Sequence, residues 1–187
     1  PARRNPTICT LEGSALVSSA SACGLMVKDY GRLLAEDAAY ADRARRVSGA
    51  TRDLAEIIDP ADLLRAGLIP CTGLRVAWQS PCTLQHGQQL GGRVEALLQA
   101  AGFGLEPRRE TTLCCGSAGT YSILQPDLSG ELRRRKVAAL TVGSPQAIAT
   151  ANIDCLEHLR GTSPVPVRHW IELEADALER TPRRAAL

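Results

Sequence analysis

The sequence predicts an α/β protein built around a parallel sheet, in a duplicated architecture whose first copy is cut short. Short segments of small, β-compatible residues alternate with helical segments along the 187 residues, which is the pattern of βαβ units. In addition, residues 15–23 align without gaps on residues 147–155, and both segments end in a cysteine. With 44% hydrophobic residues, the chain can bury one sizeable core or two small lobes.

The first part of the chain is expected to open with a buried strand. Residues 15–22 run directly into Cys23, as a parallel strand that ends in a functional turn would. A helix over about residues 27–41 is predicted next. The helical pattern then continues over residues 42–58, and Asp59-Pro60 is expected to interrupt it.

The second part of the chain gives a clearer pattern of elements. Strands are predicted at residues 74–79, 103–108 and 147–152, and helices at residues 91–101, 126–140 and about 168–178. Gly102 and the turn at residues 143–145 are expected to end the first two of these helices. Residues 113–119 are predicted to form a glycine-rich loop, which lacks both the Walker lysine and the GxGxxG pattern of phosphate loops.

Composition excludes several classes of protein. The net charge of +2 arises from 22 basic and 20 acidic residues. The electrostatic field is therefore too weak to favour binding to nucleic acid or to an anionic membrane. No apolar window is long enough for a transmembrane segment, and the first residues lack a signal peptide, which favours the cytoplasm. The chain starts at Pro1 and is interpreted as a piece of something longer. Seven cysteines in a cytosolic protein favour metal or thiolate chemistry over disulfides.

Four cysteines are expected to meet at one edge of the sheet. Cys82 follows one predicted strand, Cys114 and Cys115 follow the next, and Cys155 follows a third. The carboxyl ends of parallel strands gather at one edge, where ligands bind. His158 adds an imidazole at CxxH spacing from Cys155. Adjacent cysteines can reach different irons of one cluster, so an iron-sulfur cluster is favoured, while zinc and the absence of a metal remain alternatives.

The remaining candidates have plainer interpretations. Cys9 and Cys71 are expected to be buried small side chains, whereas Cys23 repeats the position of Cys155 and stays a candidate ligand. His86 is expected to hydrogen-bond the site, shuttle a proton or cap its loop. His169-Trp170 is expected to pack at the start of the last helix, and the basic run 133–136 is expected to be a solvated helix face or a docking patch.

Several strings carry a resemblance to a known family. The arrangement of Cys82, Cys114-Cys115-Gly116 and Cys155 resembles the cysteine-rich CCG module of heterodisulfide reductases. The strings at residues 81–87, 113–121, 150–155 and 166–172 resemble the iron-sulfur subunits of glycolate oxidases, over almost the whole chain. One departure is that the heterodisulfide reductase repeat ends in CxxC, whereas this chain has His158 at the last position.

The resemblance implies a Rossmann-like, duplicated CCG region. Residues 1–70 would be the remnant of the first repeat with connecting helices, and residues 71–187 the second repeat, with Cys23 surviving from the first. A conventional 4Fe-4S cluster would be held by Cys82, Cys114, Cys115 and Cys155, with His158 as a further candidate. An imidazole in place of a thiolate removes negative charge and should raise the reduction potential.

The implied function is electron transfer rather than catalysis. Flavin-containing subunits would oxidise glycolate to glyoxylate, and this polypeptide would pass electrons onward, toward a quinone acceptor. The protein would be cytoplasmic or peripheral at the inner membrane. The alternatives are a lactate-oxidising or heterodisulfide-reducing electron-transfer subunit and a zinc-stabilised assembly module.

Overall fold

The computed structural model describes residues 15–68, 70, 73–107 and 109–180 of the chain, and confirms an α/β fold with parallel sheets. The strands are β1 (Leu16–Ser18), β2 (Thr51–Asp53), β3 (Arg75–Gln79), β4 (Gly104–Leu105), β5 (Ala147–Thr150) and β6 (Val167–His169). The helices are α1 (Ser21–Lys28), α2 (Tyr30–Leu33), α3 (Ala41–Ala50), α4 (Leu54–Ile57), α5 (Pro60–Arg65), the π-helix η3 (Thr83–Gly87), α6 (Arg93–Ala100), α7 (Tyr121–Leu124), α8 (Pro126–Thr141), α9 (Ile153–Arg160) and α10 (Trp170–Arg180).

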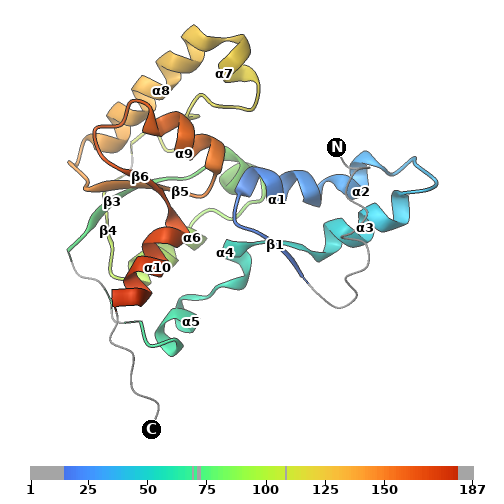
Figure 1. The fold of residues 1–187 in the computed structure, drawn as a ribbon, viewed down its shortest axis with the longest axis horizontal. Helices are drawn as coiled ribbons and strands as arrows, with labels where there is room; N and C mark the ends of the chain where they lie inside the picture. The colour runs from blue at the N-terminus through green and yellow to red at the C-terminus, as the bar shows by residue number, and fades with distance from the viewer. Residues whose placement is uncertain (1–14, 69, 71–72, 108, 181–187) are drawn as a thin grey trace.

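The larger sheet has the strand order β4-β3-β5-β6, and its described pairings are all parallel. Helices α6 and α10 cover one face and α8 and α9 the other (Figure 1). Successive side chains of a strand point to opposite faces, and β3 follows this rule: Val76 and Trp78 pack with α6 and α10, whereas Ala77 packs with α8 and α9. The central strands β3 and β5 are buried on both faces, which explains their runs of small and apolar residues.

A smaller lobe lies to one side of this body and contains β1, β2 and α1 to α3 (Figure 1). Its two strands pair in parallel, with Leu16 opposite Thr51 and Ser18 opposite Asp53. The sequence predictions were wrong here in two places. Where one helix was expected over residues 27–41, α1 ends at Lys28 and the short α2 ends at Leu33. The helix expected over residues 42–58 ends at Ala50 because the next residues pair with β1.

Three further expectations need correction. Asp59-Pro60 starts a helix rather than breaking one: the Asp59 side chain accepts from Ala61 N–H, and Pro60 occupies the first turn of α5, where its missing N–H costs nothing. The strand expected at residues 103–108 is only β4. The last helix begins at Trp170 rather than at residue 168, because residues 167–169 pair with β5 as β6.

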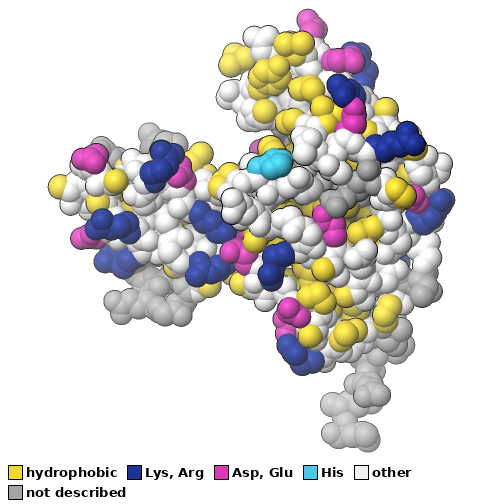
Figure 2. Space-filling model, turned by 180° about the vertical axis from the view of Figure 1, so that it is seen from behind, with side chains coloured by type: hydrophobic (Ala, Val, Ile, Leu, Met, Phe, Trp, Pro, Cys, Tyr) yellow, Lys and Arg dark blue, Asp and Glu magenta, His cyan; other side chains and the backbone are white. Residues whose placement is uncertain are grey.

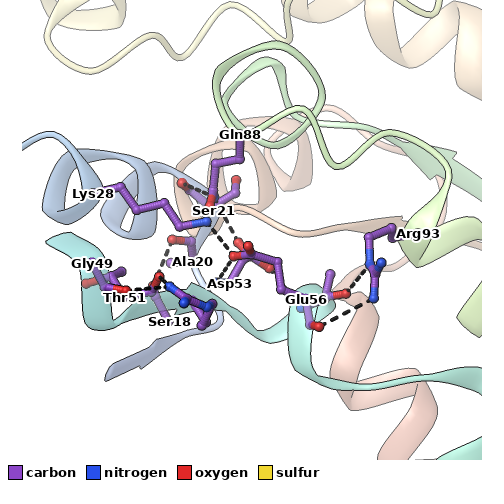
Figure 3. Close-up of polar contacts among 12 residues, drawn as sticks. Ser18, Ala20, Ser21, Lys28, Gly49, Thr51, Asp53, Glu56, Gln88 and Arg93 are labelled. Carbon is purple, nitrogen blue, oxygen red and sulfur yellow. Dashed lines mark hydrogen bonds and ion pairs between the residues drawn. The ribbon is translucent and has the colours of Figure 1, made fainter. Parts of the chain in front are cut away.

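A polar network joins the small lobe to the larger body (Figure 3). The side-chain nitrogen of Gln88 donates to Ser21 O at 2.9 Å and to Asp53 Oδ2 at 3.0 Å. Glu56, which follows β2, pairs with Lys28 of α1, and Arg93 of α6 donates to the carbonyl of Ala55 at 2.7 Å. The lobe is therefore attached through α1, β2 and α4.

The surface has a small apolar area at the α7 end of the molecule. Ile123, Leu124 and Leu128 are 77%, 70% and 57% exposed, and apolar side chains gather at this end, at the top of Figure 2. Within the described ranges, every helix is too short or too polar to cross a lipid bilayer.

Candidate metal centre

Four cysteines reach one edge of the larger sheet from three different segments. Cys82 comes two residues after Ser80, at the carboxyl end of β3, and immediately precedes η3. Cys114 and Cys115 lie in the loop between β4 and α7, and Cys155 follows β5. Because β4, β3 and β5 are neighbours in a parallel sheet, their carboxyl ends bring these segments together. Cys155 lies in the first turn of α9 rather than at the end of a strand.

The thiols form a chain of contacts. The Sγ atoms of Cys115 and Cys155 are 3.1 Å apart, and Cys114 shares hydrogen bonds with both Cys82 and Cys115. Cys115 and Cys155 are buried, Cys114 is half-buried, and Cys82 is exposed. The four thiols thus extend from the interior of the protein to its surface.

The hydrogen bonds between the thiols shift their pKa values in opposite directions. Hydrogen bonds from Cys115 and Cys82 lower the pKa of Cys114, and the bond from Cys115 lowers the pKa of Cys155. The pKa of Cys82 is raised by its bond to Cys114, and that of Cys115 by its bonds to Cys114 and Cys155. The thiolate form is thus favoured at Cys114 and Cys155 relative to Cys82 and Cys115, and a metal ion would replace the remaining thiol protons on ligation.

Gly116 shapes the loop that carries the cysteine pair. Its φ is +98°, a conformation that favours glycine, and an added Cβ would lie 2.5 Å from the carbonyl oxygen of Ser129. The same Cβ would lie 3.1 Å from Leu132 Cβ and 3.2 Å from His158 Nε2. The backbone N–H of Gly116 lies 3.4 Å from Cys114 Sγ. The glycine after the cysteine pair therefore lets the loop pack closely on α8 and α9.

His158 lies behind this loop, on α9. Its Nε2 is 3.2 Å from the hydroxyl of Ser129, and that hydroxyl donates to the carbonyl of Gly116 at 2.8 Å. Burial is the largest cause of its lowered pKa. Within the described part of the chain, no hydrogen bond joins the His158 ring to a thiol, so the geometry ties this imidazole to the loop backbone through Ser129.

The other residues singled out in the sequence lie around the site or away from it. Cys23 is in α1 and exposed, and among the described contacts its thiol is not bonded to the other four. His86 lies on the surface in η3. His169 Nε2 is 3.0 Å from the carbonyl of Ser19, so this ring contacts the small lobe. Cys9 and Cys71 lie outside the described residues.

Lys136 is a functional candidate that the sequence pattern placed wrongly. It was expected on a solvated helix face together with Arg133, yet its side chain is buried and donates to the carbonyl of Glu110 at 3.0 Å. Burial lowers its pKa, while the negative charge of Cys115, Glu110, Cys114 and Cys155 opposes that shift. A helical spacing gives the missed signal, because Lys136 lies four residues after Leu132 and four before the buried Leu140.

Asn152 is a second residue that the sequence pattern did not single out. Its side-chain nitrogen lies 3.6 Å from Cys155 Sγ, and the residue is buried. Its position directly before α9, three residues before the cysteine, is the signal that was available in the sequence.

The donor set fits a thiolate-bound metal group. Four thiols lie within one contact chain, with a buried ammonium group and two N–H donors next to them. Soft sulfur donors suit iron-sulfur clusters and zinc. Among the described residues, no three histidine, cysteine, aspartate or glutamate side chains converge on the position of a single metal ion. The described thiols therefore form a chain of contacts and not a preformed tetrahedral zinc site.

Comparisons with known proteins agree with the resemblance seen in the sequence. Residues 76–160 match the family described as CCG, the cysteine-rich domain. The chain is 45% identical over 166 residues to the glycolate oxidase iron-sulfur subunit of Escherichia coli, which covers 89% of this chain and 40% of that protein. A probable glycolate oxidase iron-sulfur subunit of Bacillus subtilis is 26% identical, covering 80% of this chain and 34% of that protein. Lactate utilization protein A of Bacillus licheniformis is 25% identical, covering 84% and 68%.

The chain thus spans less than half the length of both glycolate oxidase subunits that it matches. The matched segment 76–160 contains all four cysteines of the contact chain and His158. It begins within β3 and ends with α9, which are the elements that deliver those cysteines. Residues 76–160 thus match the CCG cysteine-rich domain, and the chain is similar to the iron-sulfur subunits of glycolate oxidases.

Proposed function

We propose that this chain is the C-terminal part of an iron-sulfur electron-transfer subunit of a glycolate oxidase. Cys82, Cys114, Cys115 and Cys155 would hold its cluster, of the 4Fe-4S type. Flavin-containing partner subunits would oxidise glycolate, and a quinone would accept the electrons. The protein would act in the cytoplasm or at the inner-membrane surface. Residues 1–70 would be the remnant of a first CCG repeat, and residues 71–187 the second.

One observation supports this proposal above the others. Thiols from three segments, separated by as many as 73 positions between Cys82 and Cys155, meet at one sheet edge, with Cys115 and Cys155 Sγ 3.1 Å apart. Four neighbouring thiols are not needed to stabilise a domain that already has a large core. Zinc would account for some of the thiols, but no single-ion geometry is present among the described residues.

An iron-sulfur cluster would supply one-electron transfer at this position. The chain's own groups would set its environment: Gly116 N–H and the Asn152 amide donate toward sulfur atoms, and Lys136 places a positive charge in the same region. Such groups favour the reduced, more negative state and therefore raise the potential. The exposure of Cys82 provides the route by which electrons reach and leave the site.

His158 and Cys23 receive different roles in this proposal. The contact of His158 with Ser129 favours support of the loop over ligation. Cys23 lies on α1, whose Ser21 hydroxyl is 2.7 Å from that of Thr83, the residue after Cys82. The helix that carries Cys23 therefore borders the site, and this thiol remains a candidate for a ligand donated by the first repeat.

Anaerobic reconstitution of the whole chain tests the proposed cofactor. We expect uptake of iron and acid-labile sulfide with the visible absorption of thiolate-bound iron. Cys114→Ser and Cys115→Ser should each lower the iron content or change the spectrum, whereas the matched Cys9→Ser variant should not. Equal effects in all three variants would contradict the ligand assignment. A colourless protein that binds zinc without sulfide would support the assembly-module alternative instead.

The substrate of the complex needs a separate test. Lactate utilization protein A, of which this chain covers a larger share, makes a lactate-oxidising complex the second candidate, and a heterodisulfide reductase-like complex the third. The reconstituted full-length subunit would be mixed with its flavin-containing partners. Reduction of the cluster by glycolate and not by lactate supports the proposal, and the reverse result selects the lactate-oxidising complex.

A further inference from the structure

Asn152 connects the cysteine site to the small lobe through a single amide group. Its Nδ2 lies 3.6 Å from Cys155 Sγ, and its Oδ1 accepts from the backbone N–H of Ala22 at 3.3 Å. Ala22 is in the first turn of α1, and the next residue along this helix is Cys23. The preceding N–H of α1, on Ser21, donates to the carbonyl of Ala151 at 3.0 Å. Residues 151 and 152 thus accept hydrogen bonds from the N-terminus of α1.

The orientation of the Asn152 amide follows from its partners. A backbone N–H can only donate, so the atom that faces Ala22 must be the side-chain oxygen. The NH₂ group is then left to face the sulfur of Cys155. An inverted amide would place two donors against each other at Ala22, in a residue that is only 4% exposed to solvent.

The Asn152 side chain does not cap α9, although its position would allow this. It is the N-cap residue of α9, where asparagine is favoured because its oxygen accepts from the first turn of the helix. Here the side chain makes no such capping bond. The amide is used instead between a thiol on its own helix and a helix N-terminus from the other lobe.

We propose that Asn152 is a positioning residue that donates a hydrogen bond to the Cys155 sulfur and anchors the N-terminus of α1 beside it. This inference rests on the cluster proposed above. The bond would stabilise the charge that accumulates on sulfur when the cluster is reduced. The anchor would keep the lobe that carries Cys23 at a fixed place next to the site.

Two variants separate the two halves of the amide. Asn152→Ala removes both the donor and the acceptor. Asn152→Asp keeps an oxygen for Ala22 N–H but replaces the donor with a negative charge next to sulfur. The matched control is Thr150→Val, two residues before Asn152. This variant removes the buried hydrogen bond from the Thr150 hydroxyl to the Gln79 side chain and leaves the contact between Asn152 and Cys155 unchanged.

We expect two independent readouts in the whole chain. The midpoint potential of the reconstituted cluster should fall in Asn152→Ala and fall further in Asn152→Asp, with Thr150→Val unchanged. Amide hydrogen exchange at Ala22, measured in the metal-free protein, should speed up in Asn152→Ala and stay at the wild-type rate in Asn152→Asp.

Each half can fail separately from the function proposed above. A cluster that forms with wild-type potential in Asn152→Asp overturns the donor role and leaves the electron-transfer function standing. Unchanged Ala22 exchange in Asn152→Ala overturns the anchor. A wild-type protein that takes up no iron and sulfide overturns the proposed function and the donor role together. The hydrogen-exchange rate at Ala22 still tests whether Asn152 anchors α1, because it is measured in the metal-free protein.

Discussion

Replacement of Gly116 by alanine should destabilise the larger body far more than the same change at Gly119. Both residues lie in the cysteine loop and both have positive φ, +98° and +63°. A left-handed conformation costs a non-glycine residue about 1–2 kcal/mol. Only at Gly116 does the new Cβ also meet neighbours, with the Ser129 carbonyl oxygen at 2.5 Å, whereas nothing lies within 4 Å at Gly119.

The steric part of the penalty can be estimated from this pair. The nearest atom to the Gly116 Cβ is backbone, so relief requires a shift of α8 or of the loop, and overpacking of this kind costs about 1–3 kcal/mol. The total expected for Gly116→Ala is about 2–5 kcal/mol, against about 1–2 kcal/mol for Gly119→Ala. The difference between the two variants isolates the close approach.

Urea unfolding followed by tryptophan fluorescence measures this difference. The chain has two tryptophans, Trp78 and Trp170, and both are 1% exposed in the core of the larger body. The metal-free protein suffices, so the result does not depend on any cluster. Equal destabilisation by the two variants, or a Gly116→Ala midpoint at the wild-type value, would refute the close packing of this loop on α8.

Three further predictions concern other parts of the molecule. Glu174 is buried without a hydrogen-bond partner for either carboxylate oxygen among the described residues, and burial raises its pKa from 4.5 to about 7. Because the folded state holds this proton more tightly, wild-type stability should fall relative to Glu174→Gln as pH rises from about 4.5 to 7, by at most about 3 kcal/mol; parallel pH profiles of unfolding would contradict this. Gly87→Ala places a Cβ 2.4 Å from Leu25 Cδ2 and should cost about 1–3 kcal/mol, with recovery in a Leu25→Ala background; strictly additive effects in the double-mutant cycle would show that α1 and η3 are not in contact there. Lys136→Met should make the midpoint potential of a reconstituted cluster more negative by tens of millivolts because it removes a buried positive charge near the thiols, and the exposed, salt-bridged Arg134 provides the control variant Arg134→Gln, in which the potential should not move.

The elements that the sequence predicted well are those whose signals are local. The helix expected at residues 126–140 is α8, with Pro126 in its first turn, and the helix expected at residues 91–101 is α6, followed by Gly102 at φ +85°. Strands β3 and β5 lie within the strands expected at residues 74–79 and 147–152. The division of the chain at residue 70 and the duplication remain predictions.

The elements that the sequence missed depend on distant partners. Residues 51–53 continue a helical pattern, yet they form β2 because β1 lies beside them. Residues 167–169 form β6 because they pair in parallel with the edge of β5. Hydrogen bonds to a strand that is distant in the sequence outweigh local propensity, which is worth only tenths of a kcal/mol per residue.

For the site, the sequence by itself determined the residue types, their order and the sheet edge at which they meet, because parallel strands bring their carboxyl ends together wherever they occur in the chain. Only the tertiary structure decided what surrounds the four cysteines. Lys136 was turned inward by the packing of α8, His158 was held by Ser129 behind the loop, and Asn152 was placed between Cys155 and α1. These roles come from contacts between segments, and a pattern along one chain carries no direct record of them.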